Sequence, residues 1–121
     1  MKKIILVLCL VFGVCFAGKI EELFDKCHKY DDGNSCLEIA RIILEQQKID
    51  KDGYFVALAS LLHGCDDIND GGCCGALASI FEGSNEYKKA KENYAKCCRL
   101  GKGRVGEVCC DGYKRLKNQG Y

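Results

Sequence analysis

Apolar residues recur along the chain at steps of three and four, which is the spacing of one face of an α-helix. They form two sets of matching segments. In the first set each segment ends in a cysteine: Ile20, Phe24 and Cys27; Leu58, Leu62 and Cys65; Ala90, Tyr94 and Cys97. The second set comprises Cys36, Ala40, Ile43 and Leu44; Cys73, Leu77, Ile80 and Phe81; Val105, Cys109, Gly112 and Tyr113. The pattern predicts an internal repeat of paired helices.

The spacing predicts six helices, and the joints between them are rich in turn-forming residues. The predicted ranges are 18–29, 35–47, 51–64, 72–82, 85–99 and 104–117. The joints "DDGNS", "DDINDGG" and "EGSN" supply Asp, Asn and Gly, which tolerate turn conformations. A single helical hairpin cannot bury its apolar stripe alone, so neighbouring hairpins should stack. The expected fold is all-α, a short α-solenoid of about six antiparallel helices cross-linked by disulfides.

The first residues, "MKKIILVLCLVFGVCFAG", have the pattern of a secretory signal. Two lysines precede an apolar run that is too short to span a bilayer and that ends in a small residue. We therefore predict a signal peptide over residues 1–17 and one helical domain over residues 18–121. The protein should be secreted or periplasmic, with no stable membrane insertion after cleavage.

Composition changes this expectation in two ways. The 121 residues carry 18 basic and 17 acidic side chains, and loss of Lys2 and Lys3 with the signal would leave a nearly neutral domain. This balance argues against nucleic acid as a partner. Two of the 11 cysteines, Cys9 and Cys15, would also leave. Nine cysteines in an exported domain predict disulfides and one unpaired thiol.

Spacing suggests a pairing scheme for these cysteines. Cys27 and Cys36 bracket one joint between helices, and Cys65 and Cys73 bracket another, so each pair is expected to form a disulfide. The remaining cysteines allow alternatives: Cys74 with Cys97 or Cys98, and the other of those two with Cys109 or Cys110. Because Cys109 shares the inward register, Cys110 is the expected free thiol, able to link a second copy or a partner.

Metal and cofactor sites are not expected. The chain has no Cys-x-x-Cys, and its two histidines, His28 and His63, form no ligand pair in the sequence. We expect His28 on the surface and His63 at a helix end. "GKGRVG", residues 101–106, matches a dinucleotide-binding motif in letters, but a predicted helix precedes it where that motif needs a strand. It is expected to be a loop, and an anion site at Lys102 and Arg104 is the less favoured interpretation.

The segment from Cys73 to Gly103 is similar to a known repeat. Its Leu77-Ala78-x-Ile80-Phe81, Gly83, Ala90 and Tyr94-Ala95, together with the preceding Cys-x7-Cys, resemble the Sel-one-like repeats of the Helicobacter cysteine-rich protein family, which are related to tetratricopeptide repeats. The resemblance covers essentially residues 18–121 as about two and a half repeats. The chain departs from the pattern at a short link between Gly83 and Tyr87, and at Val105, where a cysteine is expected.

The resemblance implies two functions. Proteins of this kind commonly act as adaptors, which favours a non-catalytic module that binds an unknown protein or peptide. The alternative is weak β-lactamase or penicillin-binding activity. No serine here is followed by the Ser-x-x-Lys lysine, because the third residues after the four serines are Glu38, His63, Glu82 and Tyr87. No residue is assigned as catalytic, and binding is the preferred function.

Overall fold

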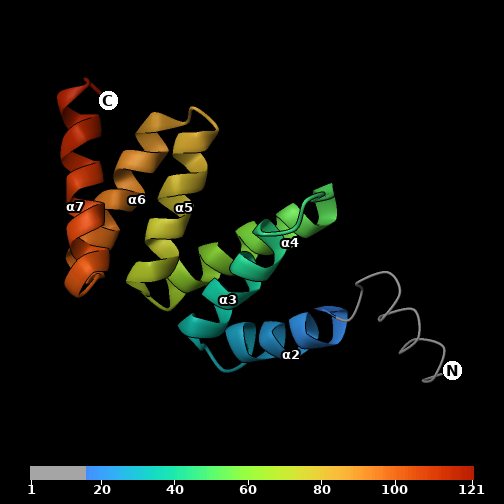
Figure 1. The fold of residues 1–121 in the computed structure, drawn as a ribbon. Helices are drawn as coiled ribbons and strands as arrows, with labels where there is room; N and C mark the ends of the chain where they lie inside the picture. The colour runs from blue at the N-terminus through green and yellow to red at the C-terminus, as the bar shows by residue number, and fades with distance from the viewer. Residues whose placement is uncertain (1–15) are drawn as a thin grey trace, which may run out of the picture.

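The computed structural model describes residues 16–121 and is helical over all its regular elements in that range. Figure 1 shows the helices following one another in chain order, with the C-terminal helix at one end. The elements are α2 (Phe16–His28), α3 (Gly33–Leu44), α4 (Lys51–Leu62), η1 (His63–Asp67), α5 (Gly71–Gly83), α6 (Tyr87–Leu100) and α7 (Gly103–Asn118). The all-α prediction is confirmed. Residues 1–15, which hold most of the predicted signal peptide with Cys9 and Cys15, lie outside the described residues.

The predicted turns lie where the three joints were expected. The backbone φ angle is positive at Asp31 (52°), Asn69 (62°) and Asn85 (62°), one residue in each joint. Asp and Asn tolerate this left-handed conformation better than other side chains do. Asp70 then begins α5, because its carboxylate accepts a hydrogen bond from the backbone N–H of Cys73 at 3.0 Å.

The structure differs from the predicted helices at the end of α4. This helix continues into η1, a π-helical segment in which the N–H of Ile68 donates to the carbonyl of His63 five residues earlier. Such a segment places more residues in each turn than an α-helix does. The side chains after His63 therefore point in directions that a regular helical period does not predict.

Buried side chains form one continuous core, to which every helix contributes. Cysteines fill much of its centre, together with Ile39, Leu61, Leu77 and Leu116, which are fully buried. Most positions of the predicted inward faces lie in this core or against it. Three do not, because Phe24, Leu62 and Val105 are exposed. α6 packs along both α5 and α7, and these three helices lie side by side at one end of the molecule (Figure 1).

Candidate functional site

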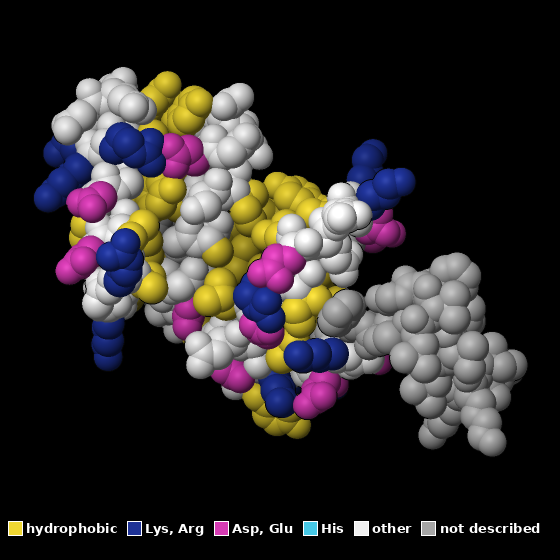
Figure 2. All heavy atoms as spheres, viewed as in Figure 1, with side chains coloured by type: hydrophobic (Ala, Val, Ile, Leu, Met, Phe, Trp, Pro, Cys, Tyr) yellow, Lys and Arg dark blue, Asp and Glu magenta, His cyan; other side chains and the backbone are white. Residues whose placement is uncertain are grey.

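An apolar groove opens between α3, α5 and α7, with a volume of about 400 Å³. Figure 2 shows hydrophobic side chains gathered between the part of the molecule made by α5, α6 and α7 and the part made by α3 and α4. The lining residues of this α3/α5/α7 groove are Leu37, Gly72, Gly75, Ala76, Ser79, Tyr94, Arg104, Val105, Val108 and Cys109. Its lining is almost entirely apolar, and Arg104 contributes the one charged side chain among these residues.

The two sides of the groove differ in character. On α7, Val105 and Val108 are 46% and 54% exposed, so their side chains present apolar surface to solvent. On α5, the facing residues are small, and Gly75 allows a close approach to the next helices. A Cβ atom on Gly75 would lie 3.0 Å from Sγ of Cys109 and 3.2 Å from Sγ of Cys97. The groove therefore combines exposed apolar side chains on one side with small residues on the other.

A polar network holds α5, α6 and α7 together beside the groove. The Glu82 carboxylate accepts hydrogen bonds from the Arg115 guanidinium, at 2.5 and 2.9 Å, and from the Tyr94 hydroxyl at 2.8 Å. The Arg115 hydrogen bond lowers the pKa of Glu82, against the opposite effect of its partial burial. Because Tyr94 also lines the groove, this network positions one of its walls.

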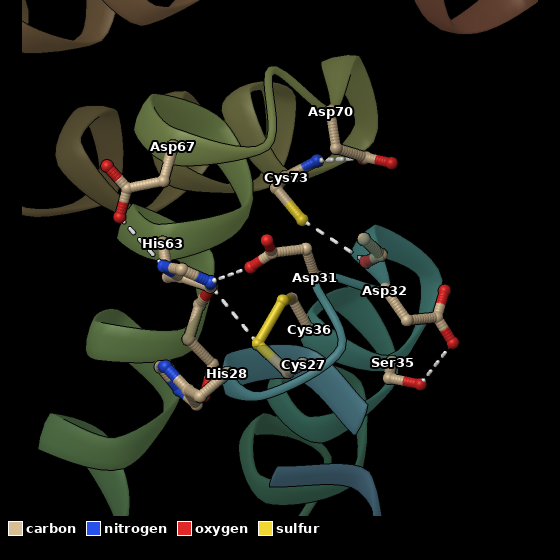
Figure 3. Close-up of a disulfide and its surroundings, with 12 residues drawn as sticks. Cys27, His28, Asp31, Asp32, Ser35, Cys36, His63, Asp67, Asp70 and Cys73 are labelled. Carbon is tan, nitrogen blue, oxygen red and sulfur yellow. Dashed lines mark hydrogen bonds and ion pairs between the residues drawn. A yellow bond between two sulfur atoms is a disulfide. The ribbon is translucent and has the colours of Figure 1, made fainter. Parts of the chain in front are cut away.

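The first disulfide joins α2 to α3 (Figure 3). It is the predicted Cys27–Cys36 bond, with a Cα–Cα distance of 4.8 Å, and both cysteines are fully buried. The Cα–Cα distance lies within the range that disulfide geometry allows. This bond therefore closes the "DDGNS" joint as expected.

The second disulfide differs from the prediction, because Cys65 bonds Cys74 and not Cys73. The Cα atoms of Cys65 and Cys74 are 4.7 Å apart. Consecutive residues of a helix point about 100° apart, so only one of the adjacent cysteines can face Cys65. Cys73 instead points toward α3, where its thiol lies 3.5 Å from the carbonyl oxygen of Gly33 (Figure 3). The expected bonds from Cys74 to Cys97 or Cys98 are wrong for the same reason, since Cys74 is already paired.

Two parallel disulfides join α6 to α7. Cys97 bonds Cys109 and Cys98 bonds Cys110, with Cα–Cα distances of 5.7 and 4.7 Å. The prediction of Cys110 as the free thiol is therefore wrong. Both bonds span twelve residues, and the shared separation keeps the two adjacent cysteines of α6 in register with the two of α7.

Cys73 is the unpaired cysteine among the described residues. Its thiol is fully buried, and burial raises its pKa to about 12, with further contributions from the charge and hydrogen bond of Asp70. It packs against Gly64, where even a methyl group would overlap with its sulfur atom. A buried thiol with a raised pKa is a poor nucleophile, so Cys73 lacks the reactivity that was expected of Cys110.

The two histidines come together, although the sequence showed no relation between them. Their rings stack with centroids 4.8 Å apart. His63 also contacts Asp67 at 2.7 Å and Asp31 at 2.9 Å (Figure 3). Partial burial alone would lower the pKa of His63, but these two carboxylates outweigh it and raise the pKa. The pKa of His28 is lowered by burial and then by the charge of His63. His28 is half-buried, so its expected surface position is only partly correct.

No catalytic arrangement is apparent around these histidines in residues 16–121. Ser60 lies 3.5 Å from the His28 ring, but it is fully buried and cannot meet a substrate in this conformation. Within the described range, no group of three or more His, Cys, Asp or Glu side chains has an arrangement that could hold a metal ion. The histidine cluster connects elements of the fold, because His63 links η1 to the joint between α2 and α3 through its contact with Asp31.

Comparisons with known proteins leave the family unassigned. No family model, curated protein or solved structure matches the chain. Among the helices described, none has both the length and the apolar character needed to cross a membrane.

The groove is the feature that sequence reasoning missed. The signal that could have found it is the run of small residues in "GGCCGALAS", four of which line one side of the groove.

Proposed function

We propose that this protein is an exported, disulfide-stabilised binding module that holds a peptide segment of a partner protein in the α3/α5/α7 groove. In this proposal the helices form a short α-solenoid of antiparallel Sel-one-like repeats. The observation that carries the proposal is the groove itself, where exposed Val105 and Val108 face small residues of α5. Exposed apolar surface in a concave site is typical of ligand binding.

The lining defines the chemistry of the expected ligand. A volume of about 400 Å³ accommodates a few side chains rather than a folded domain. The apolar lining favours aliphatic or aromatic side chains, and Arg104 favours a carboxylate beside them. The ligand should therefore be a short peptide with one or two large apolar residues next to an acidic residue.

The largely apolar lining of the groove supports binding better than catalysis. The alternative function, β-lactam hydrolysis, gains no support from Ser60 because this serine is buried. Hydrolysis of a chromogenic cephalosporin by the oxidised protein, with a chelated control, should stay at background. Turnover that survives chelation would favour the alternative.

Selection from a displayed peptide library on the oxidised protein tests the binding function. Selected peptides should contain the apolar–acidic pattern, and their affinity can be measured by fluorescence polarisation. Val108→Asp places a charge in the groove and should weaken binding at least about tenfold, which corresponds to about 1.4 kcal/mol. Phe55→Asp is a matched control, because Phe55 is 71% exposed on α4 and lies outside the groove lining.

Two results would contradict the proposal. The first is the selection of peptides that bind wild type and Val108→Asp equally well. The second is a loss of affinity that Phe55→Asp causes to the same extent. Far-UV circular dichroism of both variants checks that the helices are intact.

A further inference from the structure

The Cys98–Cys110 disulfide differs from the other three in its exposure. Six of the eight bonded cysteines are buried: Cys27, Cys36, Cys65, Cys74 and Cys97 are fully buried, and Cys109 is 3% exposed. Cys98 and Cys110 are each only partly buried. A small molecule in solution can therefore reach this bond without opening the core.

The same bond lies in a second hollow, which is separate from the α3/α5/α7 groove. This Cys98–Cys110 hollow has a volume of about 490 Å³ and is lined by Cys98, Gly101, Gly103, Gly106, Glu107, Cys110, Asp111 and Lys114. Three of these residues are glycines from the joint and the first turn of α7, which contribute no side chains to the lining. The two sites are lined by different faces of α7: Val105 and Val108 line the groove, whereas Glu107 and Cys110 line the hollow.

The hairpin of α6 and α7 does not depend on this bond for its closure. Cys97 and Cys109 join the same two helices one position earlier on each. If the Cys98–Cys110 bond opens, the buried bond still holds the helices together. The molecule can therefore lose one disulfide without releasing the part of the core that α6 and α7 form.

We propose that the Cys98–Cys110 disulfide is a thiol-exchange site, at which a small thiol or a cysteine of a partner peptide becomes covalently attached. In the first step, a thiolate attacks one sulfur of the pair and forms a new disulfide with it. The other sulfur leaves as a thiolate and takes a proton from water. In the reverse step, this cysteine attacks the mixed disulfide, restores the Cys98–Cys110 bond and releases the thiol. Both directions proceed through the in-line exchange that all disulfides use, and their rates depend on access.

The test is a time course with reduced glutathione as the probe, on the purified, oxidised protein. Samples are quenched with acid, alkylated and mapped by mass spectrometry, which assigns each cysteine separately. Cys98 and Cys110 should open at least about tenfold faster than any other pair, with glutathione attached to one of them. The far-UV circular dichroism should stay unchanged while this happens. A ten-residue peptide with one central cysteine replaces glutathione in a second arm, to separate a small-thiol site from a peptide-thiol site.

Several outcomes would overturn the proposal. These are opening of all four bonds in parallel, opening of a buried pair first, and adduct formation only as helicity is lost. In the Cys98→Ser/Cys110→Ser variant the fast phase should vanish while the slow phases keep their rates. If that variant does not fold, the wild-type time course still decides, because it compares four bonds within one molecule. The result does not depend on whether a peptide occupies the groove, so the two proposals can fail separately.

Discussion

The parallel disulfides between α6 and α7 should be largely redundant for stability. Either bond alone closes a loop of the same length between the same two helices, since both span twelve residues. The chain-entropy relation gives about 2.8 kcal/mol for a loop of this size. Once one bond is closed, the second joins residues that are already held close, so its further contribution should be below about 1 kcal/mol.

This reasoning gives a different expectation for each variant. Cys98→Ser/Cys110→Ser should lower the free energy of unfolding by less than about 1 kcal/mol. Cys97→Ala/Cys109→Ala keeps the loop closed but removes two buried sulfur atoms, and should cost about 1–2 kcal/mol. Removal of all four cysteines loses the loop constraint as well and should cost about 4–5 kcal/mol. The combined loss should thus exceed the sum of the two separate losses by about 2 kcal/mol.

Urea unfolding of the non-reduced proteins, followed by circular dichroism, measures these values. Peptide mapping of each variant checks that the remaining cysteines keep their partners. Additive losses, within about 0.5 kcal/mol, would refute the redundancy. A loss of about 3 kcal/mol in Cys98→Ser/Cys110→Ser alone would also refute it, because the exposed bond would then carry the loop constraint by itself.

Three further predictions concern other parts of the core. Glu82→Gln should destabilise the protein by about 1 kcal/mol near neutral pH. Because the pKa of Glu82 is lowered in the fold, the difference in unfolding free energy, measured in urea, should become smaller in acid. A difference that does not change with pH would contradict the role of the Glu82 charge. Asp67→Asn should lower the free energy of unfolding by about 0.5 kcal/mol at about pH 5.5 and by less at about pH 8. The pKa of His63 is raised in the fold, so its charged contact with Asp67 stabilises the protein at low pH, and this stabilisation is lost as the pH rises through that pKa. An equal cost at both pH values would contradict this role of His63. Cys73 should resist iodoacetamide in the folded protein and react once the protein is unfolded in urea; native labelling would show that the thiol is accessible.

Helical periodicity was sufficient to predict six α-helices near their observed positions, because apolar residues recur at steps of three and four within each of them. The prediction was wrong at Cys73, since the π-helical turn of η1 and the direction of adjacent side chains on α5 decide which cysteine meets Cys65. A constant sequence separation between bonded cysteines would have been the better guide to their pairing. Cys27–Cys36 and Cys65–Cys74 both span nine residues, and the two α6–α7 bonds both span twelve.

The helical pattern did not predict the full lining of the groove or the histidine cluster, for a different reason. Both depend on residues far apart in the chain that packing brings together. Val108 lines the groove together with small residues of α5, which lie far from it in the sequence. His63 contacts Asp31, which lies thirty-two positions away. Exposure of Val105 was also unforeseeable, because its place in the repeat indicated the inward face. Periodicity identifies the face of a helix that tends to be buried. It does not show how much of that face the neighbouring helices cover.

The short span of every disulfide has a consequence for the way this protein is made. Among the described residues, no bond joins cysteines more than twelve positions apart, so each can close as soon as its own two neighbouring helices have formed. Oxidation can therefore proceed from the N-terminus to the C-terminus while the rest of the chain is still unfolded. A chain whose covalent contacts are all local also avoids the slow search for distant partners. Errors of pairing should be confined to adjacent cysteines. An isomerase would therefore be needed at Cys73 and Cys74 on α5 and at the doubled cysteines that join α6 to α7.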